Sequence, residues 1–215
     1  MIVSVMLSLC FGFVGVFFIA FYSEDTRLKP FSLAIIFKLW IYRIYFLLLC
    51  VFSLCVLMWF GIDVIYVIMM LLLLLGLIDI KCLAVPDTIN FLLLLVCIGY
   101  VFIDSQHSFV QRVLMGFGVG GVFFALKILY QSLVQKEIIG EADIIVLSSI
   151  GIAFGALNAF ISVFLGSVAA LVYAIFLAIF YRVNLAQLKL PFCFFIFLGT
   201  TINLAWLSFV IHENP

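Results

Sequence analysis

The run Val64-Ile-Tyr-Val-Ile-Met-Met-Leu-Leu-Leu-Leu-Leu-Gly-Leu-Ile78 has no charged side chain and ends directly at Asp79. A helix that crosses a bilayer needs about 20 mostly apolar residues, and similar runs recur along the whole chain. Candidate spans lie near residues 2–22, 44–60, 64–80, 89–103, 109–130, 143–158, 160–181 and 192–211. We therefore predict an all-α protein, a polytopic membrane helical bundle of about eight transmembrane helices.

The composition excludes a water-soluble protein. Of the 215 residues, 69% are hydrophobic and 9% are charged, whereas soluble domains average about 25% charged residues. So few charges do not cover a water-soluble surface, and we expect residues 1–215 to form a single membrane domain in a lipid bilayer. The formal net charge is zero, which gives no indication of nucleic acid as a partner.

The cysteines indicate neither a metal centre nor a disulfide framework. The sequence has no Cys-Xaa-Xaa-Cys pair, and most cysteines lie within apolar runs, where cysteine behaves as a small buried hydrophobe. We therefore expect no bound metal. The six cysteines are Cys10, Cys50, Cys55, Cys82, Cys97 and Cys193.

The basic residues predict the orientation of the spans. Nine of the ten lysines and arginines fall in or near one set of connections, and only Arg112 falls in the other. Cytoplasmic loops carry an excess of Lys and Arg, so the first side is expected to face the cytoplasm, with both termini on the opposite side. The cytoplasmic side also holds four acidic residues, Asp79, Asp87, Glu141 and Asp143. The nine basic residues are Arg27, Lys29, Lys38, Arg43, Lys81, Lys127, Lys136, Arg182 and Lys189.

Asp79 and Asp143 are the strongest candidates for catalytic residues. Each lies at the edge of an apolar run, and a carboxylate that reaches the centre of a membrane helix costs about 2.5–3.5 kcal/mol. Two carboxyl groups that are close together in a low dielectric share one proton. One then acts as a base toward water and the other as an acid toward a carbonyl oxygen. This is the chemistry of peptide hydrolysis by an aspartyl dyad, and it needs no metal or cofactor.

Neighbouring residues are candidates for supporting roles. Pro86 lacks an N–H and ends helices, so the stretch 79–87 should be irregular near membrane depth, where such backbone is tolerated only inside protein or around a wet cavity. Gly140 permits a backbone conformation or a close approach that other residues resist. Asp87 is expected to cap the helix that follows, and Glu141 to be a solvated loop charge. The complete supporting set is Lys81, Pro86, Asp87, Gly140 and Glu141.

Three motifs together resemble those of the bacterial type IV prepilin peptidases, a family of intramembrane aspartyl peptidases of the Gly-Xaa-Gly-Asp type. Asp79, followed after six residues by Pro86-Asp87, is similar to the first signature of that family, and Gly140-Glu-Ala-Asp143 is similar to the second. Lys189-Leu-Pro-Phe-Cys-Phe-Phe-Ile-Phe-Leu-Gly199 resembles the opening of its last helix. The resemblance covers roughly residues 60–205, which we expect to form the peptidase core.

The resemblance implies that Asp79 and Asp143 are the catalytic pair of an enzyme in the bacterial inner membrane. Members of the family cleave the basic leader of type IV prepilins or pseudopilins after a glycine, on the cytoplasmic side of the substrate's hydrophobic helix. Many members also methylate the new N-terminus with S-adenosylmethionine. We expect the substrate helix to lie beside the spans 64–80, 89–103 and 143–158.

The chain departs from the family pattern in four places. Ala142 replaces the second glycine of Gly-Xaa-Gly-Asp, Ile145 replaces a lysine that often follows the second aspartate, and Phe192-Cys-Phe lacks the usual Gly-Pro. Residues 23–43, which we expect to be a short cytoplasmic loop, replace a cysteine-rich insert. We therefore expect a reduced form of the peptidase that needs no cofactor, with S-adenosylmethionine only if methyl transfer is retained.

Other functions remain open at this point. Taken singly, Asp79 could mark the end of a helix and Asp143 could cap one. The two residues could also form the proton or cation relay of a small transporter or channel, because intramembrane acids often mark such paths. A third alternative is an assembly factor without activity. Neighbouring pilin or secretion genes would favour the peptidase, and flux in proteoliposomes would favour the transporter.

Overall fold

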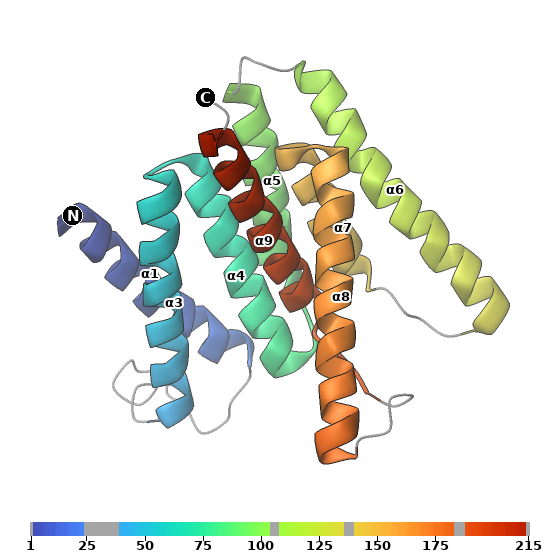
Figure 1. Ribbon diagram of the computed structural model, residues 1–215, viewed down its shortest axis with the longest axis horizontal. Coiled ribbons are helices and arrows are strands. Elements are labelled where there is room, and N and C mark those ends of the chain that lie inside the picture. Colours follow the sequence, from blue (N-terminus) through green and yellow to red (C-terminus); the bar gives the residue numbers. More distant parts are fainter. Residues whose placement is uncertain (1, 24–38, 104–107, 136–139, 183–187, 214–215) are drawn as a thin grey trace.

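The computed structural model describes residues 2–23, 39–103, 108–135, 140–182 and 188–213. Within these residues the chain is entirely α-helical, as the hydropathy pattern predicts (Figure 1). The helices are α1 (Ile2–Tyr22), α3 (Trp40–Phe60), α4 (Val64–Cys82), α5 (Asp87–Ile103), α6 (Phe109–Val134), α7 (Glu141–Phe154), α8 (Ala156–Tyr181) and α9 (Phe192–Glu213).

Six of these helices are long and apolar enough to cross a membrane: α1, α3, α4, α6, α8 and α9. The prediction of a polytopic helical bundle is therefore confirmed. Helix α5 is a shorter apolar helix of 17 residues, and α7 has 14 residues. At 1.5 Å per residue α7 is about 21 Å long, which is less than the hydrocarbon thickness of about 30 Å.

The boundaries differ from the predicted spans in places where the sequence stays apolar across a break. Helix α7 ends at Phe154 rather than near residue 158, because Gly155 adopts a φ of 89°, which is readily accessible only to glycine. Helix α3 begins at Trp40 rather than near residue 44. The predicted loop 23–43 is therefore shorter at its end, and its residues 24–38 lie outside the described part of the chain.

Helix α4 is the most buried of the six candidate membrane spans, since 72% of its apolar 18-residue stretch is buried inside the protein. It packs against α9, α5, α3 and α1, while α8 packs on α9 and α7 packs on α5 and α6. Figure 1 shows α1 and α3 on one side of the molecule and α6 on the other, with α4, α5 and α9 between them. In the same view the end of α4 and the beginnings of α7 and α9 point toward the lower end of the bundle.

Candidate active site

Asp79 lies in the last turn of α4, and its side chain is held by the beginning of α9. The residue is 6% exposed, and its Oδ2 accepts a hydrogen bond of 2.9 Å from the backbone N–H of Cys193. The first N–H groups of a helix have no partner within the helix and favour negative charge, so the α9 terminus is a suitable support for a carboxylate.

The third motif of the sequence explains why a helix begins at this position. Pro191 precedes the first residue of α9, and its carbonyl oxygen accepts a bond of 3.4 Å from the N–H of Phe195. Proline is favoured at the start of a helix because its fixed φ suits the helix and its missing N–H is not needed there. In the sequence this motif indicates only a family resemblance, and the bond from the backbone after Pro191 to Asp79 was not predicted.

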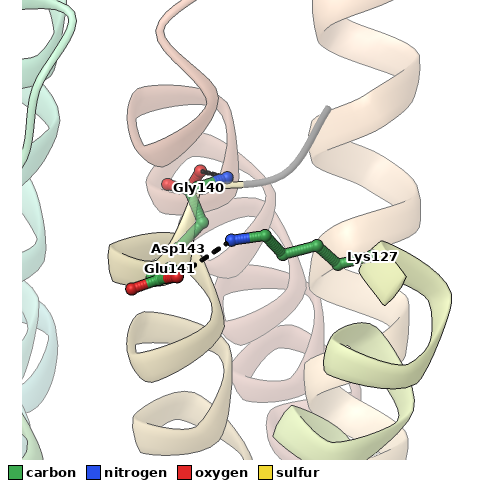
Figure 2. Close-up of polar contacts among 4 residues, drawn as sticks. All are labelled: Lys127, Gly140, Glu141 and Asp143. Atoms are coloured by element: carbon green, nitrogen blue, oxygen red, sulfur yellow. Dashed lines mark hydrogen bonds and ion pairs between the residues drawn. The ribbon is translucent and has the colours of Figure 1, made fainter. Parts of the chain in front are cut away.

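Asp143 lies in the first turn of α7, where its side chain turns back toward the helix start. Its Oδ2 accepts a hydrogen bond of 3.2 Å from the N–H of Gly140, as Figure 2 shows. The capping role considered for Asp143 is therefore present, but the side chain also reaches a pocket. Gly140 has a φ of −67°, a backbone conformation that any residue can adopt. What the glycine provides is therefore the space that a side chain would fill. A Cβ at this position would lie 3.0 Å from Asp143 Oδ2.

The two aspartates line the same pocket. Its volume is about 490 Å³, and it is bordered by α4, α7, α8 and the segment that leads into α9. Asp79 and Asp143 are close enough for their carboxyl groups to interact electrostatically. The lining residues are Asp79, Leu83, Gly140, Asp143, Ala170, Leu188, Lys189, Leu190, Phe192 and Phe195. The structure thus brings together two carboxyl groups that are separated by more than sixty residues in sequence.

A family model described as the type IV leader peptidase family matches residues 66–175, which is just over half of the chain. The chain belongs to this family. The matched region begins in α4 and ends in α8, so it contains both Asp79 and Asp143. This leader peptidase is accordingly a multi-pass membrane protein. Comparisons with curated proteins and with solved structures gave no match.

Asn90 is a residue of this site that the sequence analysis missed. It lies on α5 with no exposed surface, and its Nδ2 donates a hydrogen bond of 2.8 Å to the carbonyl oxygen of Ala142. Its Oδ1 is buried and has no hydrogen-bond partner among the described residues. Asn90 therefore connects α5 to the residue before Asp143. The available signal was a polar residue four positions after Pro86, in the stretch Pro86-Asp-Thr-Ile-Asn90.

The sequence suggested that Glu141 is a solvated loop charge, but in the structure it is the first residue of α7. Its side chain is 84% exposed and pairs with Lys127 of α6, with 3.3 Å between Oε1 and Nζ. The Lys127 side chain is only 6% exposed, and Figure 2 shows it extending from α6 toward the beginning of α7. The pair connects α6 to the turn that carries Asp143.

The remaining predicted residues lie beside the pocket rather than in its lining. Lys81 donates hydrogen bonds to Ser23 Oγ, at 2.9 Å, and to the Tyr42 hydroxyl, so it connects α4 to α1 and α3. The stretch 79–87 is less irregular than predicted, because α4 remains helical to Cys82 and only 83–86 are non-helical.

Helix α5 begins at Asp87, and the carbonyl oxygen of Pro86 accepts the N–H of Asn90. Pro86 thus occupies the cap position that was expected for Asp87. The exposed Asp87 lies instead in the first turn of α5, where negative charge is favourable. In the described part of the chain, no group of three or more His, Cys, Asp or Glu residues could hold a metal ion.

Proposed function

We propose that this leader peptidase is an intramembrane aspartyl endopeptidase that removes the basic leader of prepilin-like proteins. The observation that carries the proposal is the shared pocket of Asp79 and Asp143. A pair of carboxyl groups in a poorly solvated pocket is the arrangement that aspartyl proteolysis requires. Family membership favours this reading over a transport relay made from the same two residues.

In the proposed reaction the two aspartates share one proton. The ionised carboxylate takes a proton from a water molecule, whose oxygen attacks the carbonyl carbon of the scissile peptide, while the protonated carboxyl donates to the carbonyl oxygen. Collapse of the tetrahedral intermediate breaks the C–N bond, and the leaving amine receives a proton from the dyad. The net reaction adds one water across one peptide bond. We assign no residue to S-adenosylmethionine.

The pocket lies at the end of the bundle that holds most of the described basic residues, Arg112 excepted, which supports a cytoplasmic active site in a bacterial inner membrane. Arg43 lies near the start of α3, Lys81 in the last turn of α4, and Arg182 directly after α8, while Lys189 lines the pocket. An excess of basic residues marks the cytoplasmic side. The substrate would then present its leader from the cytoplasm and its hydrophobic helix from the bilayer.

The test is incubation of the purified protein with a prepilin in detergent or lipid vesicles, followed by mass measurement of the product. We expect one cut at the end of the leader, and loss of at least about 10²-fold in rate for Asp79→Asn and for Asp143→Asn. S-adenosylmethionine tests for methyl transfer in the same assay. A product that is about 14 mass units heavier with it than without it has gained one methyl group.

Asp63→Asn is the matched control. Asp63 caps the opposite end of α4 by accepting a hydrogen bond of 2.6 Å from the N–H of Val64, and asparagine caps helices as well as aspartate does. This variant should cleave like the wild-type protein. Normal cleavage by either Asp79→Asn or Asp143→Asn would refute the proposed mechanism.

A further inference from the structure

A second hollow adjoins the pocket of the two aspartates and faces the outside of the bundle. It has a volume of about 590 Å³ and lies between α4, α8 and α9. Every side chain that lines it is apolar or aromatic. The residues used below are Ile80, Val172, Tyr173, Phe176, Phe194 and Phe195, and we call this surface the α8–α9 groove.

The groove lies next to the active-site pocket. Phe195 lines both hollows, and its ring lies 5.8 Å from that of Tyr173. Asp79 lines the pocket while the next residue, Ile80, lines the groove. A segment bound along the groove would therefore have one end close to the carboxyl pair.

Helix α8 extends past the beginning of α9, and none of the described residues covers one wall of the groove there. Figure 1 shows the lower half of α8 projecting beyond the first turn of α9. Val172 is 62% exposed and Phe176 is 48% exposed. Only 17% of the apolar 18-residue stretch of α8 is buried inside the protein. The floor is closed, because Gly76 of α4 packs so tightly on α9 that a Cβ there would lie 3.1 Å from Phe194 Cα.

We infer that the α8–α9 groove binds the apolar helix of the substrate, directly on the C-terminal side of the cleaved bond. The inference rests on the proposed function, which requires such a helix to enter from the bilayer and to end at the aspartates. An exposed apolar surface that adjoins the carboxyl pocket satisfies both requirements. This position differs from the one expected from the sequence, which lies beside α4, α5 and α7.

The first test is photo-crosslinking with a synthetic peptide that has a short basic leader, one glycine and an apolar helix of about 20 residues. A photoreactive phenylalanine analogue replaces Phe176 in the Asp143→Asn protein, so that the peptide is bound but not cut. The matched control position is Phe124 on α6, which is 50% exposed and lies one turn before Lys127. We expect crosslinks to the peptide from position 176 and not from position 124.

The second test uses the catalytically intact protein. Val172→Trp should obstruct the groove and lower kcat/KM for the same peptide about tenfold, mainly through KM, which is a common effect of reshaping an apolar subsite. Val122→Trp on α6 is the control, since Val122 is 47% exposed and does not line the groove. Its kcat/KM should match that of the wild-type protein.

These tests separate the docking inference from the proposed function. Crosslinking at position 176 without any cleavage by the wild-type protein would remove the function and keep the docking site. Cleavage with equal crosslinking at both positions, with crosslinks from position 176 only to lipid or to a second copy of the chain, or with an unchanged KM for Val172→Trp would overturn the inference.

Discussion

Replacing Asn90 by leucine separates the stability of the fold from the placement of Asp143. Leucine has nearly the same shape as asparagine but cannot donate to the carbonyl oxygen of Ala142. The lost hydrogen bond of 2.8 Å is worth about 0.5–1.5 kcal/mol. The substitution also removes the buried Oδ1, which has no partner among the described residues, and an unpaired buried acceptor costs about 1–3 kcal/mol. The two terms oppose each other, and their central values differ by about 1 kcal/mol, so the free energy of unfolding should change little.

The catalytic rate should respond differently from the stability, because nothing in the substitution compensates for a displaced Asp143. The bond from Asn90 fixes the first turn of α7 relative to α5, and a displacement of about 1 Å at reacting groups can lower the rate about 10²-fold. We therefore expect kcat to fall by at least about tenfold, with KM and the thermal unfolding midpoint in detergent nearly unchanged.

Asn203→Leu is the matched amide control. Asn203 is 4% exposed and donates a hydrogen bond of 3.2 Å to the carbonyl oxygen of Asn158, on the part of α9 that is distant from the pocket. This variant should lower the unfolding midpoint and leave kcat unchanged. The reasoning is refuted if Asn90→Leu lowers the midpoint in the same way while its kcat stays at the wild-type value.

Two further substitutions test other contacts of the site. Gly140→Ala introduces a methyl group 3.0 Å from Asp143 Oδ2, so the carboxyl group must shift. We expect kcat to fall severalfold in a cleavage assay while the unfolding midpoint changes little. An unchanged kcat would contradict the close approach. Lys81→Met removes charged hydrogen bonds to Ser23 and the buried Tyr42, each worth about 1.5–3 kcal/mol. Its unfolding midpoint should fall while kcat/KM stays within about twofold of wild type, and the opposite pattern would place Lys81 in the catalytic site.

The fold was predictable because hydropathy and backbone hydrogen bonding leave few choices in a membrane. A chain in hydrocarbon must satisfy its backbone groups internally, so an apolar run of sufficient length becomes a helix. The break at Gly155 was less predictable, since the residues on both sides of it are equally apolar. Single glycines occur inside several of the other helices, so a glycine alone does not predict the end of a helix.

The site was predictable only in part. The charge of Asp79 and Asp143 within an apolar sequence identified them as candidates, and the structure brings them to one pocket. Proximity in sequence was misleading for Lys81, because residues two apart on a helix point to nearly opposite sides. The support from Cys193 could not be read from the chain, since it joins residues that are 114 positions apart and involves a backbone N–H that every residue type except proline can provide.

The supports of the two aspartates share one physical feature that explains how an almost charge-free protein tolerates the pair. Asp79 accepts its hydrogen bond from the first turn of α9, and Asp143 accepts its own from Gly140, the residue directly before α7. The beginnings of two helices therefore meet at the pocket, and each carries N–H groups and a partial positive charge that favour a carboxylate. A carboxyl group at the edge of hydrocarbon is costly unless such donors are present. The position of the pocket thus follows from where α7 and α9 begin, which makes Gly140 and Pro191, rather than additional charged residues, the elements on which the dyad depends.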